Sequence, residues 1–569
     1  MQNKTSQSIP AWQTIAVAAL VFLIVLLPRI IGLDQFVTAD EPFWLSKSAN
    51  FYYALGQRDF ANTLQREYPA VTTMWAGTAG FLWRFPEYRG SGVGQIIAEK
   101  HEKVFRDLGQ EPLQLLAADR VFVVLGVTLT ITISVLYLWR LWSLPVALLS
   151  AALIAFDPFF TGMSRILHMD AFLAAFMLLS LVAFFSYLYR GGRTIDLLVS
   201  GAAAGLSWLS KSPGLFLVPF LGLLTLVQFW RFHRISAQRI TLKQFIRMLV
   251  LPLTLWFSIG AIVFVVLWPV MWVQPIETIK RMLSLAEVYA SEGHGSANFF
   301  MGIIYYWNQR PAITYLFYPI TYLWRTTPVV LLGLPLCAAG YITHRAPLQA
   351  KPERSATAGI ALYSLLFLLF ITIGNKLADR YVLSIYPALD ILGALGWVAA
   401  ARWLRQRFHT PRMGQLASYG LLFAVGLFQV LGTLPTYPYY LDYYNPLVGG
   451  SRTAPQVLGI GWGEGLDQAA RYLAEMPDAD QLTVASWYGY GSFSYLFPGK
   501  TIVIPALPKI SSDAAERMLS SDYMVIYISQ WQRRIPEVLL AQLDGKTPVY
   551  TVQLNGLDYV QVYQLGHQQ

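Results

Sequence analysis

The sequence predicts a mainly α-helical, multi-pass membrane protein that ends in a small α/β domain. Three observations support this fold class. The 569 residues are 55% hydrophobic, with a mean hydropathy of +0.45. Only 13% of them are charged, against about 25% in a soluble domain. About eleven apolar runs have the length of roughly 17–25 residues that a bilayer-spanning helix requires.

These apolar runs are the predicted spans. They lie near 12–33, 115–139, 144–160, 171–189, 195–210, 213–230, 250–273, 327–344, 356–374, 382–401 and 414–433. The fifth run is short. The first is too long for the core of a signal peptide, and no small-residue cleavage site precedes Asp34, so we expect a retained span.

Basic residues divide between the two ends of the spans and predict the topology. With the N-terminus in the cytoplasm, most Lys and Arg fall in inner loops, as they do in other membrane proteins. The inner residues are Lys4, Arg140, Arg190, Arg193, Arg231, Arg234, Arg239, Lys243, Arg247, Arg345, Lys351, Arg354, Arg402, Arg405, Arg407 and Arg412. The short outer loops hold only Arg165, Lys211, Lys376 and Arg380. The net charge of +10 therefore reflects membrane orientation, and no nucleic-acid partner is predicted.

Two domains are predicted. Residues 1–433 form the membrane domain, with long outer loops at 34–113 and 274–326, the first carrying interfacial helices. The tail, 434–569, alternates helix-like segments such as EGLDQAARYLAEM with strand-like segments such as LTVASWY. This alternation is typical of a small α/β domain. We expect a plasma-membrane protein whose tail and active site are extracytoplasmic.

Ionisable residues near membrane level are functional candidates, because each costs about 2.5–3.5 kcal/mol on insertion scales. Carboxylates and cations from distant parts of the chain all fall on the outer side, where together they can hold an anion and remove a proton. The candidates are Asp40, Glu41, Glu67, Arg165, His168, Asp170, Lys211, Lys376, Asp379 and Arg380. His294, between two glycines of the second long loop, is a further candidate.

Each candidate also has a structural interpretation. Asp40 and Asp170 can cap helices, and Arg165 can form a structural pair with Asp170. Lys376 and Arg380 can reach lipid head groups. Glu67 and His294 supply only two metal ligands, whereas a site normally needs three or four. The pair is therefore weak support for a divalent metal, and we predict no certain cofactor.

Several segments, in this order and all on the outer side, resemble the GT-C glycosyltransferases. They are the Asp40–Glu41 pair, SRILHMDAFL, the Lys-Ser-Pro-Gly turn at Lys211, NFFMG with ITYLFYPITYLWRTTPVVLLGL, and KLADRYVLSIYP. Within this class, the chain is similar to the branch of protein O-mannosyltransferases and lipid A aminoarabinose transferases. The resemblance covers about residues 10–400.

The resemblance implies transfer of a sugar from a polyprenyl-phosphate donor to an acceptor in the outer compartment, with inversion at the anomeric carbon. It implies that Asp40 is the general base, with Glu41 and Asp170 as further catalytic carboxylates. Substrate-binding roles are expected for Glu67, Arg165, Lys211, His294, Lys376 and Arg380, and for the neighbouring Tyr381. The loop at 274–326 is too short for the β-trefoil domain of the eukaryotic mannosyltransferases, so the acceptor remains open among glycan, lipid and protein.

Two other functions are compatible with the composition. A secondary transporter also carries intramembrane charge, although transporters show paired repeats and helices broken at mid-membrane. A non-catalytic scaffold with an external binding domain is the second alternative. It requires no convergence of Asp40, Asp170 and Arg380, whereas an enzyme needs these residues to line one cavity.

Overall fold

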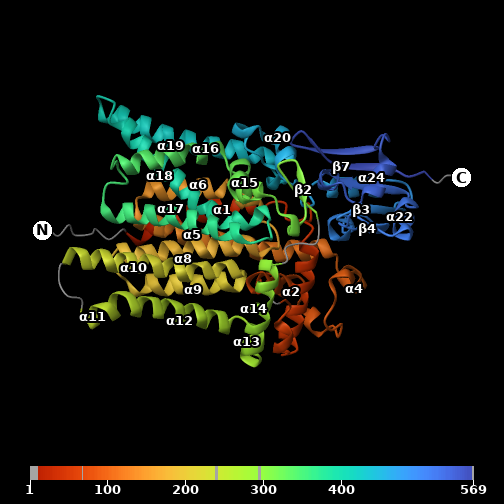
Figure 1. Cartoon of the computed structure of the whole chain (residues 1–569), viewed down its shortest axis with the longest axis horizontal. Coiled ribbons are helices and arrows are strands. Elements are labelled where there is room, and N and C mark those ends of the chain that lie inside the picture. The colour runs from red at the N-terminus through yellow and green to blue at the C-terminus, as the bar shows by residue number, and fades with distance from the viewer. Residues whose placement is uncertain (1–9, 67, 237–240, 292–296, 567–569) are drawn as a thin grey trace.

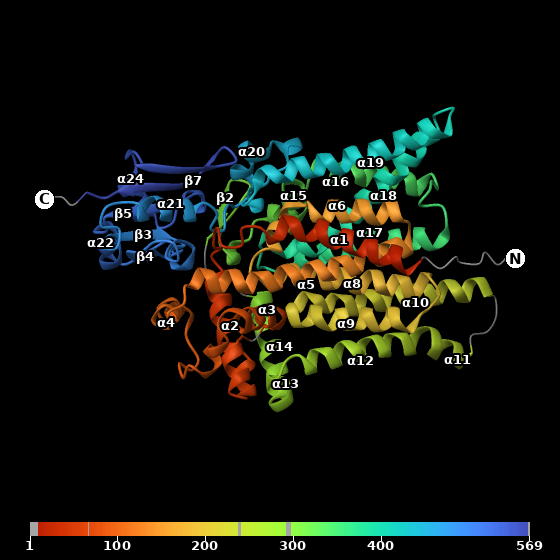
Figure 2. The ribbon, with the colours of Figure 1, turned by 180° about the vertical axis from the view of Figure 1, so that it is seen from behind.

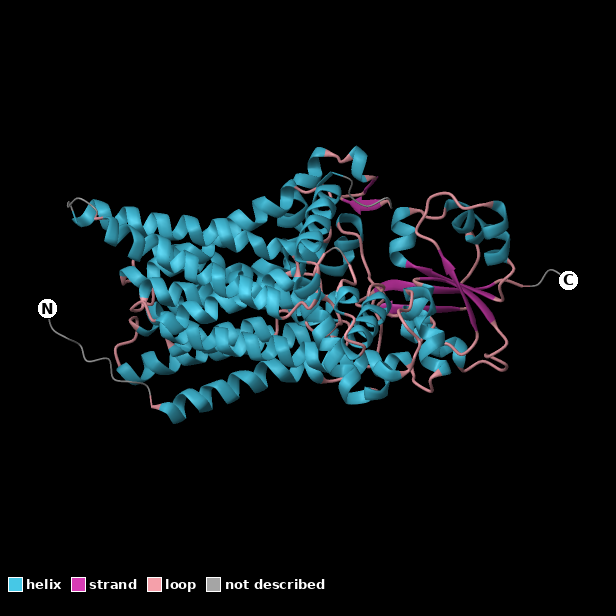
Figure 3. Cartoon of the chain, turned by 90° about the horizontal axis from the view of Figure 1, so that it is seen from below, coloured by secondary structure: helices cyan, strands magenta, loops and turns pink. Residues whose placement is uncertain are grey.

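The computed structural model describes residues 10–66, 68–236, 241–291 and 297–566. Long helices run side by side along the molecule, and a β-sheet lies beyond one end of this bundle (Figure 1). The same two parts are seen from below in Figure 3, where the strands gather at the C-terminal end. The predicted fold class, a helical membrane protein with a small C-terminal α/β region, is confirmed.

Within the described residues, eight helices are long and apolar enough to cross a membrane. They involve α1 (Ala11–Ile30), α5 (Pro112–Leu141), α8 (Met169–Tyr189), α10 (Leu217–Ser236), α12 (Leu251–Val266), α17 (Lys351–Ile373), α18 (Tyr386–Arg405) and α19 (Pro411–Thr433). A ninth span arises if a bent pair counts as one, since α15 (Phe317–Arg325) and its preceding turn meet α16 (Pro328–Ile342) at 110°.

Two shorter apolar helices, α6 (Leu144–Ala155) and α9 (Thr194–Ser210), occupy the third and fifth predicted spans. Every predicted run therefore contains a helix, whereas the count of about eleven crossings stays a prediction. Burial separates inner from outer helices: 89% of the apolar window of α8 is buried, against 17% for α12. The span that contains α18 is also 89% buried. Helices α8 and α18 thus lie inside the bundle, and α12 exposes apolar side chains, as a lipid-facing helix does.

Small residues allow close helix contact inside the bundle. On α18, a Cβ atom added at Gly396 would lie 2.0 Å from the backbone oxygen of Gly333 on α16. Only glycine permits this approach, which brings the two backbones together as in other membrane helix pairs. The contact fixes α18, and with it the short 3-10 helix Asp379–Ile385 that precedes α18 and carries Arg380.

The two long loops fold over the end of the bundle nearest the sheet. The first contains α2 (Glu41–Gly56), α3 (Val71–Arg84) and α4 (His101–Asp107). The second begins after α13 (Val270–Val273) and contains α14 (Pro275–Ser291), β1 (Asn298–Phe300) and β2 (Ile303–Tyr305). Two further short helices lie elsewhere, α7 (Pro158–Met163) before α8 and α11 (Leu242–Phe245) before α12. Figure 2 shows α2 lying across the direction of the bundle helices.

The tail contains a five-stranded mixed sheet in the order β4-β3-β5-β7-β6. The strands are β3 (Thr483–Trp487), β4 (Lys500–Ile504), β5 (Tyr523–Tyr527), β6 (Tyr550–Leu554) and β7 (Leu557–Gln564). Strand β3 pairs in parallel with β4 and β5, and β7 pairs antiparallel with β5 and β6. The helices are α20 (Gly450–Val457), α21 (Leu466–Ala474), α22 (Ser512–Leu519), α23 (Ile528–Arg533) and α24 (Glu537–Leu543).

The tail is fastened to the first long loop by polar contacts. The Ser494 hydroxyl donates to Glu102 at 2.6 Å, and the Nε2 atom of His101 contacts the Tyr495 hydroxyl. Closer to the bundle, the Ala39 amide donates to the backbone oxygen of Trp462 at 2.9 Å. The Ala39 contact joins the residue before Asp40 to the tail.

Candidate active site

The start of α2 is held by a buried ion pair that leaves Asp40 available. The side chain of Glu41 is 0% exposed and contacts the guanidinium of Arg120, with 2.6 Å between Oε1 and Nε. The same carboxylate accepts the amides of Thr38 and Leu167, each at 2.8 Å. Asp40 occupies the N-cap position but makes no side-chain capping hydrogen bond, so its carboxylate is directed elsewhere.

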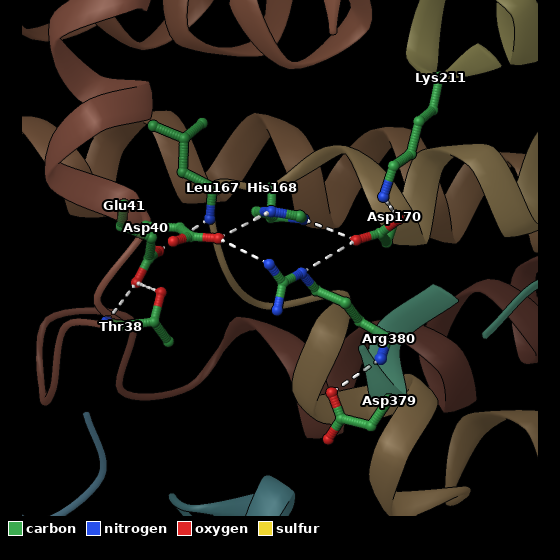
Figure 4. Close-up of polar contacts among 9 residues, drawn as sticks. All are labelled: Thr38, Asp40, Glu41, Leu167, His168, Asp170, Lys211, Asp379 and Arg380. Carbon is green, nitrogen blue, oxygen red and sulfur yellow. Dashed lines mark hydrogen bonds and ion pairs between the residues drawn. The ribbon is translucent and has the colours of Figure 1, made fainter. Parts of the chain in front are cut away.

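Asp40 belongs to a compact cluster of opposite charges, drawn in Figure 4. Its Oδ2 atom lies 3.2 Å from a guanidinium nitrogen of Arg380 and 3.5 Å from Nε2 of His168. The side chain of Asp40 is 38% exposed, whereas that of Asp170 is 1% exposed. Asp40 is thus the carboxylate of the cluster that solvent or a substrate can reach.

Asp170 is the buried anchor of the same cluster. It contacts Lys211 at 2.7 Å, Nδ1 of His168 at 3.1 Å and Nε of Arg380 at 3.7 Å. Asp170 lies in the first turn of α8, where a negative charge is favoured by the helix dipole. Because α8 is a deeply buried helix, Asp170 fixes the positions of the three groups that contact it, Lys211, His168 and Arg380.

His168 lies between the two carboxylates. It is the residue before α8 and its side chain is 2% exposed. Its ring packs edge-on against Trp462 of the tail, with 5.3 Å between ring centroids, and against Trp44 at 6.2 Å. These contacts hold the imidazole so that each nitrogen faces one carboxylate, which makes His168 a link between Asp40 and Asp170.

Aromatic rings cover the cations of the cluster. The ammonium of Lys211 lies 4.0 Å from the centre of the Tyr381 ring, and the guanidinium of Arg380 lies 4.6 Å from that of Trp462. Such rings stabilise a cation without neutralising it. Arg380 and Lys211 are therefore each held between a carboxylate and an aromatic ring.

The charges of the cluster shift the titration of its accessible members. Burial acts to raise the pKa of Asp40, but Arg380 and then His168 outweigh it and lower that pKa to about 2. Burial and the nearby cations Lys211 and Arg380 lower the pKa of the Lys376 ammonium to about 8. Lys376 is thus close enough to repel the other cations, and an anion placed among the three relieves that repulsion.

A cavity of about 360 Å³ opens beside Asp40, between the bundle and the tail. Arg380, Asp379 and Arg325 line it from the membrane domain, and Trp462, Glu464 and Arg533 line it from the tail. Arg325 is paired with Asp379 at 3.0 Å. The cavity combines an accessible carboxylate, a cation and aromatic surface, which suits a polar substrate with ring faces.

Four predicted site residues, Asp40, Asp170, Lys211 and Arg380, meet in this cluster, and Tyr381 covers it. The suggested pairing of Arg165 with Asp170 is wrong. Arg165 donates instead to the backbone oxygen of Gly32 at 3.0 Å and packs on Tyr440, so it holds the end of α1. Glu67 and His294 lie outside the described residues.

Three contributors were assigned no role from the sequence. His168 was a candidate without a role of its own, and Trp462 lies in the tail, where no site residue was predicted. The segment GIGWGEG was a signal for Trp462, because closely spaced glycines permit tight backbone approach: at Gly463, φ is +128° and an added Cβ would lie 2.5 Å from the backbone oxygen of Val37. The third contributor is Arg325, which lies in the segment ITYLFYPITYLWRTTPVVLLGL.

No group of three or more His, Cys, Asp or Glu side chains in the described ranges is arranged to hold a metal ion. The weakly considered metal pair of Glu67 and His294 falls outside those ranges. Among the described residues, the cluster around Asp40 combines three cations, Arg380, Lys211 and Lys376, with two carboxylates.

Comparisons with known proteins bear on this architecture. Residues 117–272, from α5 to α13, match the family model described as dolichyl-phosphate-mannose-protein mannosyltransferase. This range contains His168, Asp170 and Lys211. No curated protein matches the sequence.

Solved structures offer broader likenesses. The chain is similar to ArnT from Cupriavidus metallidurans in the apo state, with 14% identity, 98% of this chain and 99% of that chain covered, and a TM-score of 0.47. The S. cerevisiae protein O-mannosyltransferase Pmt1-Pmt2 complex bound to the sugar donor is similar at 18% identity, with 48% of this chain and 35% of that chain covered and a TM-score of 0.36. The oligosaccharyltransferase AglB from Archaeoglobus fulgidus, in complex with an inhibitory peptide and a dolichol-phosphate, is similar at 13% identity. The match covers 91% of this chain and 70% of that chain, with a TM-score of 0.41.

The family match confirms the resemblance to GT-C glycosyltransferases that the motifs predicted. The chain is a multi-pass membrane protein, and its residues 117–272 are similar to this mannosyltransferase family.

Proposed function

We propose that this protein moves a sugar from a polyprenyl-phosphate donor to an acceptor in the cavity beside Asp40, with Asp40 as the general base. One observation carries the proposal. The accessible carboxylate of the cluster lies in direct contact with Arg380, and both line one cavity. A base beside an anion-binding cation is what displacement of a phosphate leaving group requires.

In the proposed step, an acceptor oxygen forms a bond to the anomeric carbon of the donor sugar. The bond between that carbon and the phosphate oxygen breaks, and its electron pair leaves with the polyprenyl phosphate. The acceptor proton passes to Asp40. A phosphate leaves without protonation, so one carboxylate suffices, unlike the two that glycoside hydrolysis uses. A single displacement inverts the anomeric configuration.

Arg380, Lys211 and Lys376 are the proposed phosphate ligands. All three lie near Asp40 and Asp170, and with these carboxylates they leave one excess positive charge, three cations less two anions. The phosphate competes with Asp40 for Arg380. Donor binding therefore weakens the contact that lowers the pKa of Asp40 and makes the carboxylate more basic. Binding of the donor thus raises the basicity of the carboxylate that accepts the proton.

The other charged residues position these groups. Asp170 is buried and orients Lys211, His168 and Arg380 at once. Glu41 is enclosed by Arg120, Thr38 and the Leu167 amide, so we assign it to the placement of Asp40 and not to proton transfer. His168 contacts the Oδ2 atom of Asp40 through its Nε2 atom at 3.5 Å.

The acceptor enters from the tail side of the cavity. Trp462, Glu464 and Arg533 form that wall, and the ring of Trp462 also covers Arg380. In this proposal the tail shapes acceptor access, and it also contributes a side chain to the surroundings of the donor site. Acceptor specificity is expected to reside in these tail residues.

Purified full-length protein incubated with a panel of polyprenyl-phosphate sugars and membrane-extract acceptors tests the proposal. The expected result is acceptor-dependent release of polyprenyl phosphate, with a product of inverted anomeric configuration by NMR. A protein that binds such donors but gives a product of retained configuration contradicts the single displacement. Transport of a solute in sealed vesicles, without turnover of any donor, favours the transporter instead.

A further inference from the structure

A second cavity lies at the opposite end of the bundle, far from Asp40. It has a volume of about 480 Å³ and is bordered by α8, α10, α16 and α17. Tyr189 of its wall and Asp170 of the candidate active site stand at the two ends of α8. Tyr189 follows Asp170 by 19 positions, which correspond to about 28 Å of helix. This length is close to the thickness of the hydrocarbon core, about 30 Å. The two cavities therefore lie at opposite faces of the membrane.

The charged side chains that line this cavity are all basic. Arg231, His344, Lys351 and Arg354 line it, together with Gln228 and Gln349, and its lining includes no Asp or Glu. The nearest acidic candidate, Glu353, is paired with Arg190 at 2.6 Å. The positive charge therefore remains uncompensated within the cavity.

Arg354 is held in place at the cavity wall. Its guanidinium lies 3.9 Å from the centre of the Tyr341 ring and donates to the backbone oxygen of Tyr341. Arg231 and Lys351 are exposed from the neighbouring helices α10 and α17. One ordered cation with two adjustable cations around it matches the several oxygens of a phosphate.

The other wall of the cavity is apolar. Leu224 and Val227 of α10 face Ala358 and Leu362 of α17 across it. Towards the active-site end the same two helices are in contact, where Phe220 of α10 packs on Tyr363 of α17 with 5.6 Å between ring centroids. The helices thus meet at one end and enclose a cavity at the other, which leaves a cleft of the shape that an acyl chain fills.

From the cations and the apolar cleft together, we propose that this cavity binds an anionic phospholipid from the leaflet opposite Asp40. The phosphate of the lipid contacts Arg231, Lys351 and Arg354, and one acyl chain lies between α10 and α17. Basic pockets between spanning helices, on the side of the membrane where the Lys and Arg residues of the protein gather, are suited to anionic head groups. This proposal does not depend on the glycosyltransferase reaction.

Native mass spectrometry of the full-length protein in detergent micelles tests the site, with dioleoyl phosphatidylglycerol or dioleoyl phosphatidylcholine added. The wild type is expected to retain one phosphatidylglycerol and no phosphatidylcholine. Removal of two cations in the double variant Arg231→Gln, Lys351→Gln should weaken retention about 100-fold, at about tenfold for each charge-assisted contact. Both positions are exposed, so the fold should survive, and thermal unfolding checks it.

A matched double variant removes the same charge elsewhere on the same face. Lys243 and Arg412 are exposed and do not line the cavity, so Lys243→Gln with Arg412→Gln should keep the lipid. Equal loss in both double variants would reduce the effect to general surface attraction and overturn the proposal. Equal retention of phosphatidylcholine would also overturn it, as would displacement of the lipid by millimolar inorganic phosphate, which indicates a free-anion site.

A third variant keeps every cation and fills the cleft. Ala358 lines the cavity and is exposed, so Ala358→Trp should occupy the place of the acyl chain. Loss of phosphatidylglycerol from this variant supports a lipid over a soluble anion. Unchanged retention contradicts the assignment of the cleft. Turnover of donor at Asp40 is scored separately and does not decide this result.

Discussion

At the residue scale, Asp40 depends on the cation beside it. Arg380 holds the carboxylate at 3.2 Å and is the main cause of its low pKa. A carboxylate with a pKa of about 2 is a weak base at neutral pH, since proton transfer is most efficient when the pKa lies near the working pH. The cluster is therefore in a resting arrangement, which donor phosphate is expected to change by taking over Arg380.

The first prediction separates Asp40 from its neighbour Glu41. Asp40→Asn keeps the shape and removes the basic group, so transfer should fall by about 10²–10⁴-fold while the protein stays folded and binds donor. Glu41→Gln should act on stability, because it leaves the buried Arg120 without its charge partner, a loss of about 3–5 kcal/mol in comparable pairs. Turnover and thermal unfolding of both variants measure this. Near-normal turnover in Asp40→Asn, with loss in Asp170→Asn, means that the base is Asp170.

The second prediction concerns pH. Because its pKa is lowered, Asp40 is ionised in the free protein at any pH well above about 2, and the acid limb of kcat/KM should lie near that pH. Arg380→Gln removes the main cause of lowering, so the pKa should rise to or above the ordinary 3.8, and the acid limb should move upward. Donor use should also fall about ten- to a hundred-fold.

Profiles of kcat and kcat/KM against pH for wild type and Arg380→Gln test this coupling. In the wild type, the acid limb of kcat should lie above that of kcat/KM, because the bound donor occupies Arg380. Arg380→Lys keeps the charge and should restore part of the shift. Superimposable profiles for wild type and Arg380→Gln would show that Arg380 does not control the base.

Most residues of the cluster could be predicted because they violate a strong rule. Lys211 and Arg380 are cations on the side of the membrane that disfavours them, and Asp40 and Asp170 are carboxylates at span ends. Arg165 violated the same rule for a different reason, since it binds the carbonyl groups that end α1. A cation that departs from the positive-inside rule indicates a buried negative partner. The rule does not show whether that partner is a substrate or the carbonyl groups at a helix end.

At the element scale, the segment 458–464 between α20 and α21 links the tail to the membrane domain. Its Trp462 contacts Arg380 and His168, and its backbone accepts the Ala39 amide. The Glu464 carboxylate accepts the Tyr527 hydroxyl of β5 at 2.9 Å. The sheet thus supports a loop that reaches the active site.

The third prediction tests this segment through Trp462. Trp462→Ala removes the ring from Arg380, and such contacts contribute about 0.5–2 kcal/mol, so kcat/KM should fall about two- to thirty-fold. Trp462→Phe keeps an aromatic face and should recover most of the loss. Steady-state kinetics on both variants, with thermal unfolding as a control, measure the effect. Equal activity of Trp462→Ala and wild type would place the ring outside the reaction.

Local patterns predicted the elements themselves better than their partners. The strand-like segments of the tail correspond to β3 to β7 because alternation and β-branched content are local properties. The order β4-β3-β5-β7-β6 and the 110° bend before α16 depend on contacts between distant residues. Trp462 was missed for the same reason, since its neighbours His168 and Arg380 are each separated from it by more than eighty residues or by several spans.

At the scale of the whole molecule, the two cavities give the membrane protein a polarity. The cavity beside Asp40 lies between the bundle and the sheet, and the basic cavity lies one bilayer thickness away. If the basic face is cytoplasmic, as the charge distribution predicts, the tail and Asp40 are on the outer side. The donor is then used outside, and the phospholipid is bound from the inner leaflet.

The last prediction tests this orientation with the chain's own chemistry. Cys337 is the single cysteine and is buried, so Cys337→Ala gives a background without thiols. In that background, Lys509→Cys reports on the tail and Lys243→Cys on the loop after α10; both positions are exposed. A membrane-impermeant maleimide should label the tail position in intact cells and the loop position only after permeabilisation, because sixteen of the Lys and Arg residues listed for the loops are predicted to be inside and four outside. Retained turnover in each variant shows that the labelled protein is correctly folded. Labelling of Lys243→Cys in intact cells, with protection of Lys509→Cys, would reverse the topology and place both the proposed base and its donor in the cytoplasm.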